Sequence, residues 1–343
     1  MNTNKFRRLS GAVTAVLIGV TSAISFSGCG NGNTQSSTTD NITETSAPSK
    51  STADEATAVG ALEKLGIDAS LLEIEPSILH DSANTVGFQL DMPKQGDTVA
   101  VVHTSLGDFT MRFFPEQAPK AVTNFINLAK SGKYNNTTFH RVIKDFIVQG
   151  GHCGNDEDSP NGVSSYGAQF EDEFCDKLFN IRGAVSMANT AKDSNGSQFF
   201  INQTSAEAFK NNGGWTKYEN NWNEVKTQLL NYKDSNLLSA FIQKNGSKCF
   251  DVDIVPDEVR RLYEANGGNP HLDGAFNAVD RGHTVFAQVI DGMEIVDKIA
   301  AVNVNKDDKP TDNIVIKSVE IKEYSPSSAK QTEAASDTTS ASQ

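Results

Sequence analysis

The sequence predicts a mainly β protein, an antiparallel barrel or sandwich that carries one helical insertion. Short runs of β-forming residues follow one another with Gly-rich turns and few helices between them, which favours an antiparallel architecture over alternating strands and helices. The segment 205–268 interrupts this pattern with apolar residues three and four positions apart, the spacing of a helix. The 343 residues suffice for one sizeable core.

The first predicted strands, 99–103 and 109–114, flank the short loop 104–108 and therefore form a hairpin. A helix is predicted next, because Pro119 opens a stretch with apolar residues at helical spacing and Gly132 ends it. Six further runs have the length and composition of strands: 139–143, 146–149, 184–187, 198–202, 284–289 and 314–321.

Two helices are predicted in the insertion. Five residues form the apolar stripe of the first: Trp215, Tyr218, Trp222, Val225 and Leu229. The second is predicted to start at Pro256 and to stop at Gly267. The lead-in 59–96, ahead of the first strand, is expected to hold a short helix and irregular chain, broken by Gly66 and Pro76.

The chain is acidic, with 43 Asp or Glu against 30 Lys or Arg and a formal net charge of −13. This charge argues against nucleic acid as a partner and against adhesion to an anionic membrane through a basic patch, because both need a basic face. The 4 cysteines are widely spaced, so neither a disulfide scaffold nor a zinc knuckle is expected. The pairing of Cys153, Cys175 and Cys249 stays open.

The N-terminus has the organisation of a secretory signal. Three basic residues precede an uncharged stretch, 9–26, which Gly, Ser and Thr interrupt too often for a membrane span. Residues 26–29, Phe-Ser-Gly-Cys, resemble the lipobox of bacterial lipoproteins, in which the cysteine is acylated, for example with palmitate, and becomes the first mature residue. We therefore expect a signal peptide over 1–28 and a lipid anchor on Cys29 that holds an extracytoplasmic protein to the bacterial cell membrane. A plain secretory signal with an incidental cysteine is the alternative.

Polar segments lie on both sides of the expected folded domain. Residues 29–58 and 325–343 are rich in Ser and Thr and poor in apolar residues, which predicts a disordered tether and a disordered tail. The folded domain is expected over 97–324, with the insertion 205–268 inside it.

One acidic loop has residue types that bind metal ions. His152 and Cys153 are followed closely by Asp156, Glu157 and Asp158. Because the loop is also rich in Gly and Asn, a solvated acidic turn is the favoured interpretation. Neither a metal nor another cofactor is expected.

The run 139–151 places charged residues among apolar ones. In a regular strand Phe139, Arg141 and Ile143 would share one face and His140 would lie on the other. An arginine among apolar neighbours is costly to bury unless it is paired or lies at the floor of a cleft. Taken alone, the segment also fits a charge on a solvated strand face.

Two more segments bear on this choice. One contains Ser-Met-Ala-Asn at 186–189 and Ser-Gln-Phe-Phe-Ile at 197–201, and the other contains His-Leu-Asp-Gly at 271–274 and Gly-His-Thr-Val-Phe at 282–286. With the run 139–151 they resemble the cyclophilin family of peptidyl-prolyl isomerases. The resemblance covers about 97–204 and 269–322, and it implies a closed eight-stranded antiparallel β-barrel capped by two helices.

The resemblance implies roles residue by residue. Four residues are assigned to the catalytic set: Arg141, His140, Phe146 and Gln149. Arg141 matches the principal catalytic residue, His140 and Phe146 lie in the same groove, and Gln149 would hydrogen-bond the substrate backbone. Ten further positions match the substrate-binding groove: Ile147, Ala188, Asn189, Thr190, Gln198, Phe200, His271, Leu272, His283 and Phe286. The main-chain groups of Asn189 would hold the residue before proline. Of the neighbours Phe199 and Phe200 one is expected in the core, Phe286 also fits a core position, and His283 fits a rim histidine.

Two departures from the family pattern concern the groove. His271 occupies a position where many members carry Trp and bacterial ones often Phe; because that position contacts cyclosporin, weak cyclosporin binding is expected. The insertion 205–268 and the loop 275–281 flank the proline pocket, and the sequence leaves open whether they narrow, extend or partly cover it.

The implied function is isomerisation of X-Pro bonds in secreted or surface proteins as they fold, with Arg141 stabilising the twisted amide. Proline-containing segments of unfolded or folding chains would be the partners. One alternative is a proline-peptide-binding chaperone or scaffold module with little turnover. Another is an insertion that is itself the main binding surface for a client protein.

Overall fold

The structure is a computed structural model that describes residue 66 and residues 78–154 and 160–326. The chain divides into two units, 1–49 and 50–343, and every described residue belongs to the second. The predicted signal peptide, Cys29, the tether and nearly all of the tail lie outside the described residues, as does the helix predicted in the lead-in. Among the described residues, no helix is both long and apolar enough to cross a membrane.

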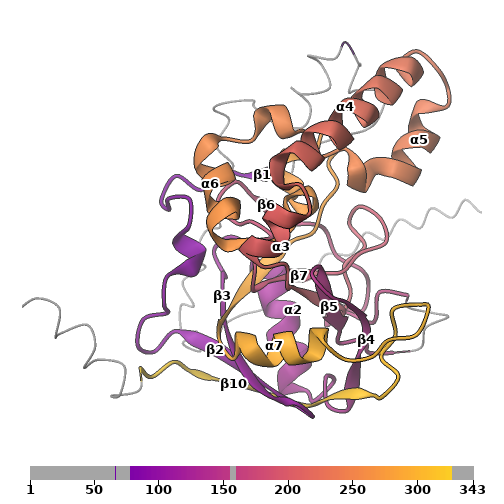
Figure 1. Cartoon of the computed structure of the whole chain (residues 1–343). Helices are drawn as coiled ribbons and strands as arrows, with labels where there is room; N and C mark the ends of the chain where they lie inside the picture. Colours follow the sequence, from indigo (N-terminus) through magenta and orange to yellow (C-terminus); the bar gives the residue numbers. More distant parts are fainter. Residues whose placement is uncertain (1–65, 67–77, 155–159, 327–343) are drawn as a thin grey trace, which may run out of the picture. The chain divides into compact units, whose positions relative to one another are not determined.

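Eight strands close into an antiparallel barrel in the order β10-β2-β3-β9-β7-β8-β5-β4 (Figure 1). Their bounds are β2 (Thr98–Thr104), β3 (Gly107–Phe113), β4 (Thr137–Ile143), β5 (Ile147–Gly150), β7 (Ala184–Met187), β8 (Phe199–Asn202), β9 (Val285–Asp291) and β10 (Ile314–Glu323). Every barrel strand predicted from the sequence is confirmed, with ends that differ by no more than two residues. The closed eight-stranded barrel implied by the resemblance is confirmed as well.

Two helices, α2 (Pro119–Lys130) and α7 (Met293–Ala300), share the core of the barrel. Phe125 of α2 is fully buried, and its ring lies 5.5 Å from the ring of Phe199 and 5.5 Å from that of Phe286. The sequence pattern predicts α2, whereas α7 was only implied by the resemblance. The alternation expected at Phe199 and Phe200 is confirmed, because Phe199 lies in this core and Phe200 in a separate apolar cluster.

Strand β4 differs from the regular strand predicted for it. Phe139 pairs with Gly150 and Arg141 with Gln149, so one extra residue, His140, is accommodated on β4 as a β-bulge. The bulge shifts the alternation by one position, so the core contains Phe139 and Val142, and the face expected to be shared by Phe139, Arg141 and Ile143 in a regular strand is not formed. Arg141 is released from the barrel core toward solvent by this shift.

The insertion is helical, as predicted. It contains α3 (Ala206–Asn211), α4 (Gly214–Tyr232), α5 (Leu238–Asn245), the short turns η3 (Gly246–Lys248) and η4 (Val252–Ile254), and α6 (Asp257–Asn266). All five residues of the predicted stripe are buried on one side of α4. The two ends of the insertion meet, because Thr204 Oγ1 donates to Asn269 Oδ1 at 3.0 Å and a Cβ on Gly267 would lie 2.3 Å from the backbone of Ser205.

A second core joins the insertion to the outside of the barrel. Trp222 and Tyr263 from the insertion belong to one buried cluster with Phe179 and Ile181 of the preceding chain. Tyr263 also donates its hydroxyl to Asp273 at 2.6 Å, in the chain that leads back to the barrel. The insertion is therefore packed against the barrel and not attached only through its ends (Figure 1).

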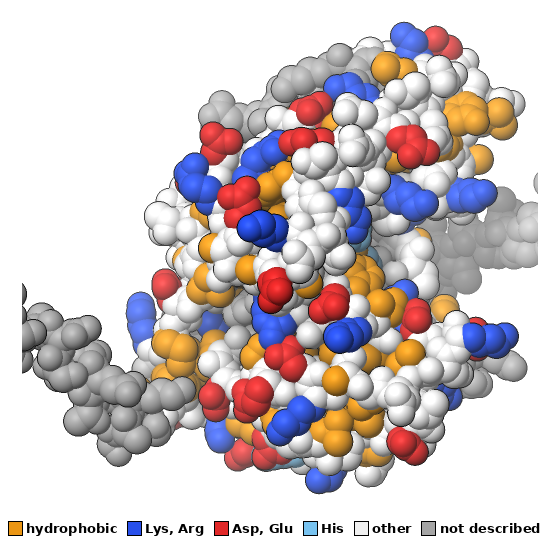
Figure 2. All heavy atoms as spheres, in the orientation of Figure 1, with side chains coloured by type: hydrophobic (Ala, Val, Ile, Leu, Met, Phe, Trp, Pro, Cys, Tyr) orange, Lys and Arg blue, Asp and Glu red, His pale blue; other side chains and the backbone are white. Residues whose placement is uncertain are grey.

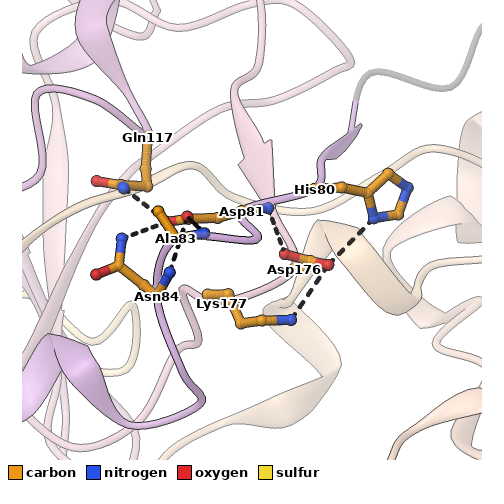
Figure 3. A network of polar contacts seen from close by, with 7 residues as sticks. All are labelled: His80, Asp81, Ala83, Asn84, Gln117, Asp176 and Lys177. Carbon is orange, nitrogen blue, oxygen red and sulfur yellow. Dashed lines mark hydrogen bonds and ion pairs between the residues drawn. The ribbon is translucent and has the colours of Figure 1, made fainter. Parts of the chain in front are cut away.

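Two carboxylates, those of Asp81 and Asp176, tie the described part of the lead-in to the rest of the domain (Figure 3). Asp81 accepts hydrogen bonds from Asn84 and, at 2.7 Å, from Gln117, while its amide donates to Asp176 at 3.0 Å. Beside it β1 (Ile78–Leu79) pairs in parallel with β6 (Phe174–Cys175), a two-stranded sheet that the sequence did not predict. The short turns η2 (Phe88–Leu90), η5 (Pro270–Leu272) and η6 (Gly274–Phe276) complete the described elements.

Candidate active site

A cavity of about 710 Å³ lies where the barrel and the insertion meet, and Figure 2 shows the surface hollowed between them. The barrel and its loops supply one part of the lining, the barrel wall: Arg141, Phe146, Ile147, Gln149, Ala188, Asn189, Phe200, His271, Leu272 and His283. The insertion supplies the rest, the insertion wall: Tyr218, Asn221, Glu224, Val225, Gln228, Phe241, Asn245, Ser247, Lys248 and Phe250. Every residue of the barrel wall was assigned to the groove from the sequence.

Arg141 projects from the bulge of β4 with its side chain 42% exposed. Its Nε lies 3.8 Å from Asp308 Oδ2, and its Nη1 donates to Gln149 Oε1 at 3.5 Å. Both contacts are long, so the guanidinium keeps donors that can turn toward a ligand in the cavity. The loop that carries Asp308 is itself fixed to β4, because the amide of Val142 donates to the Asp308 carbonyl at 2.8 Å.

A chain of amide side chains supports this arginine. Gln149 Nε2 donates to Gln198 Oε1 at 2.9 Å, which leaves the Gln149 carbonyl oxygen turned to Arg141. Gln198 Nε2 in turn donates to the carbonyl of Pro160 and to Nδ1 of His152, at 2.7 and 2.8 Å. Gln198 does not line the cavity, and it acts by fixing which way the Gln149 amide points.

An apolar cluster next to Arg141 forms the part of the cavity suited to a small ring. Ile147, Ala188, Phe200 and Leu272 are buried together, and Phe146 packs against them from the rim. Transfer of apolar surface from water to such a cluster is worth about 25 cal/mol per Å². A pyrrolidine ring has the size and polarity that these side chains would enclose.

Two histidines of the barrel wall are neutral at physiological pH. Burial lowers the pKa of His283 to about 4, against the opposing effect of the hydrogen bond that its Nδ1 donates to the Met187 carbonyl at 3.0 Å. Its ring meets the Phe200 ring edge to face, 5.1 Å between centroids. Burial, with smaller contributions from Lys217 and His283, lowers the pKa of His271 to about 3. Neither ring brings positive charge to compete with Arg141.

Asn189 lines the cavity and is fixed by its side chain. Its Nδ2 donates to the carbonyl of Gly282 at 2.8 Å and to Asp172 Oδ1 at 3.1 Å. Asp172 also accepts from Asn195 Nδ2 at 2.8 Å. Burial raises the pKa of Asp172 to about 6, although the hydrogen bonds from Asp193 and Asn195 act in the opposite direction.

Four residues assigned to the groove from the sequence do not line the cavity. Phe286 is fully buried inside the barrel, so its assignment as a substrate-binding residue is corrected to a core residue. His140 is the bulged residue of β4, and Gln198 lies behind Gln149. Thr190 lies in the adjoining loop, where its hydroxyl accepts from Asn161 and its amide donates to Ser194.

Comparison with known proteins accounts for this arrangement. Residues 99–222 and 244–321, more than half of the chain, match the model of the family described as cyclophilin type peptidyl-prolyl cis-trans isomerase/CLD. The chain belongs to the cyclophilin-type peptidyl-prolyl isomerase family. The enzyme class predicted from the sequence is the class of this family. Residues 223–243, at the centre of the insertion, fall outside the match.

Two relatives known by sequence agree with the family assignment. A Staphylococcus saprophyticus protein named as a peptidyl-prolyl cis-trans isomerase is 38% identical over 236 residues, which cover 68% of this chain and 98% of that protein. A Streptococcus pyogenes protein named as a bifunctional phosphatase/peptidyl-prolyl cis-trans isomerase is 36% identical over 239 residues, 68% of this chain but only 40% of that protein. A crystal structure of a Cryptosporidium parvum cyclophilin type isomerase is 26% identical and covers 66% of this chain and 99% of that one, with a TM-score of 0.43.

Several residues at the site of this cyclophilin were not found from the sequence. Asp308 and Asp172 are distant in sequence from the residues that they contact, Arg141 and Asn189, and no motif marks them. His152 was noted only as a possible metal ligand, whereas its Nδ1 faces Gln198. The sequence analysis left open whether the insertion extends the groove, and it identified Tyr218 and Val225 only as members of an apolar helical stripe.

The acidic loop places two of its five candidate ligands in hydrogen bonds. Cys153 Sγ donates to the Lys133 carbonyl at 3.1 Å, and burial raises the pKa of its thiol. His152 Nδ1 accepts from Gln198, as described above. The other three, Asp156, Glu157 and Asp158, lie outside the described residues. Cys153, Cys175 and Cys249 are free thiols, all of them buried.

Proposed function

We propose that this protein catalyses cis–trans isomerisation of X-Pro bonds, with Arg141 stabilising the twisted amide. The observation that carries the proposal is the position of Arg141 and the apolar cluster of Phe146, Ile147, Phe200 and Leu272 in one cavity. The reaction needs a hydrogen-bond donor, here the guanidinium, next to a pocket that encloses the proline ring.

The reaction breaks no bond, so what limits its rate is rotation about the C–N bond. The barrier is about 18–20 kcal/mol, because the nitrogen lone pair is delocalised into the carbonyl. In the twisted state the lone pair is localised on nitrogen and can accept a hydrogen bond. Arg141 would donate to that nitrogen more strongly in the twisted state than in either planar state, which lowers the barrier by differential binding.

The other groups of the barrel wall would hold the substrate while it rotates. The apolar cluster would enclose the proline ring, and Gln149 and the main chain of Asn189 would bind the chain on either side. Because Gln149 is oriented by Gln198 and Asn189 by Asp172 and Gly282, these groups are fixed before substrate arrives. Groups fixed in advance lose little conformational freedom on binding.

The test is an exchange assay on a short X-Pro peptide with the full chain and its Arg141→Ala variant. Removal of a single donor of this kind should lower kcat/KM by roughly 100-fold or more. Lys144→Ala is the matched control, since Lys144 is an exposed cation of the same hairpin that does not line the cavity, and it should keep the wild-type rate. A folded wild-type chain without exchange activity would leave a proline-peptide-binding module with little turnover as the function.

The proposed setting is the outer face of a bacterial cell membrane, where the enzyme would assist the folding of secreted or surface proteins. This rests on the lipobox-like residues 26–29 and the polar segment that follows them. Cys29→Ala should move the protein from the membrane fraction to the soluble extracellular fraction and abolish labelling by a fatty-acid analogue. The anchor would be contradicted if the variant stays in the membrane fraction and neither it nor the wild type is labelled.

A further inference from the structure

The insertion shares a cavity with the proline pocket, and we propose that it binds the same substrate. The insertion wall would contact the polypeptide several residues away from the proline, so that the enzyme favours long, extended chains over short peptides. This inference rests on the proposed function, because it takes the apolar cluster beside Arg141 as the proline site.

The geometry of α4 directs one face of the helix into the cavity. Tyr218, Asn221, Val225 and Gln228 are three or four positions apart, which places them on one side of a helix, and all four line the cavity. Helix α5 and the turn η3 extend this lining with Phe241, Asn245, Ser247 and Lys248. Part of the insertion wall, including Val225, Gln228 and Phe241, therefore lies within 223–243, the range outside the family match.

The two walls are in direct contact through His271. Its ring is stacked on Phe146 of the proline pocket, 5.8 Å between centroids, and on Tyr218 of α4, 5.6 Å between centroids. This stack of three rings holds α4 beside the proline pocket. A chain leaving that pocket along the cavity would pass from the barrel wall to the insertion wall.

The chemistry of the insertion wall suits an extended peptide of mixed sequence. Val225 and Phe250 are buried and form its apolar base, while the amides of Asn221, Gln228 and Asn245 are more exposed. Side-chain amides both donate and accept, so they can bond to the N–H and C=O groups of an extended main chain whatever its sequence. Glu224 and Lys248 add one charge of each sign, which would bind side chains of opposite sign.

The size of the cavity agrees with an occupant longer than one proline. Its volume of about 710 Å³ lies in the range of roughly 300–1,000 Å³ that encloses drug-sized ligands. The occupant could be a separate partner or a segment of the substrate. Because the insertion wall and the proline pocket line one cavity, a separate partner bound to the insertion wall would compete with the substrate. The segment of the substrate next to its proline fills both without competition.

The first test compares a four-residue and a twelve-residue X-Pro peptide as substrates of the full chain. Wild type should show a higher kcat/KM for the longer peptide. The double substitution Asn221→Ala with Gln228→Ala should reduce that advantage by roughly three- to tenfold, the range expected for loss of one or two hydrogen bonds. Asn223→Ala with Thr227→Ala is the matched control, because both residues are exposed on α4 and neither lines the cavity.

The second test uses charge. Glu224→Lys should shift the preference among twelve-residue peptides from those with lysines several residues away from the proline toward those with glutamates at the same positions. Equal kcat/KM for short and long peptides in the wild type, or equal losses in the wall and control variants, would overturn the inference and leave the isomerase intact. Absence of exchange on both peptides would instead remove the proposed function.

Discussion

The imidazole of His271 and the phenol ring of Tyr218 are stacked, with planes 24° apart and centroids separated by 5.6 Å. His271 belongs to the chain that re-enters the barrel, and Tyr218 to the first turns of α4. The stack is a direct link between the proline pocket and the insertion. It holds α4 beside the site, and the part of this helix from residue 223 onward lies outside the family match.

Loss of the Tyr218 ring should destabilise the fold. Its side chain is 6% exposed and contacts the rings of Phe209 and Phe250 as well as His271. We expect Tyr218→Ala to lower the free energy of unfolding by about 3–5 kcal/mol, as for other buried aromatic truncations. Tyr218→Phe keeps the ring and should cost less than about 1.5 kcal/mol. Urea unfolding followed by circular dichroism measures both, and equal losses in the two variants would contradict a role for the ring itself.

His271→Trp should strengthen inhibition by cyclosporin. His271 lines the cavity. The sequence resemblance to cyclophilins aligns it with a position that often carries Trp, and an indole offers a larger ring with an N–H donor. The comparison is the cyclosporin concentration that halves exchange activity in the wild type and in the variant, each checked for folding. An unchanged value would mean that the insertion wall, and not this residue, limits access of the macrocycle.

The strands could be predicted because their signals are local. Each barrel strand is a short β-rich run between turn residues, and such runs keep their identity whatever they pair with. The alternation in β4 could not be predicted, because the bulge at His140 depends on pairing with β5. The sheet of β1 and β6 could not be predicted either, because strands of two residues have no periodicity to detect.

The site was predictable to the extent that its residues lie in contiguous motifs. Arg141 and Gln149, or Ala188 and Asn189, come from single segments of characteristic sequence. Asp308 lies far along the chain from Arg141, and Asn221 and Gln228 reach the cavity only because α4 packs beside His271. Contacts made by tertiary packing leave no pattern in a single sequence.

Asp308 should act as a positioning residue for Arg141. Asp308 has φ of 59°, a region that Asn tolerates and Ala does not, so Asp308→Asn is the cleaner substitution. The exposed ion pair is worth no more than about 1 kcal/mol of stability. We expect kcat to fall severalfold with KM nearly unchanged, because the guanidinium loses one of the two groups that orient it. A rise in KM at constant kcat would indicate a role in substrate binding instead.

Asp273 should make the stability of the protein depend on pH. The residue is 2% exposed, and its carboxyl group accepts hydrogen bonds from the Tyr263 hydroxyl and the Asn180 amide. Burial raises its pKa to about 7, although those hydrogen bonds act in the opposite direction. Between its ordinary pKa, 3.8, and about 7, the folded state keeps a proton that the unfolded state releases. Stability from this group is therefore greatest at low pH and is lost as pH rises toward 7, by at most about 1.4 kcal/mol per pH unit.

Other buried groups also make stability depend on pH, so the quantity to measure is the difference in unfolding free energy between a variant of Asp273 and the wild type. Asp172, with its raised pKa, acts in the same direction as Asp273, whereas His271 and His283, with lowered pKa values, lose stability as pH falls below about 6.5. Asp273→Asn leaves those three groups in place and removes only the contribution of Asp273. The stability of this variant relative to wild type, measured by urea unfolding between pH 5 and pH 8, should improve steadily up to about pH 7 and then level off. A difference that stays constant over that range would show that Asp273 is ionised in the folded protein throughout.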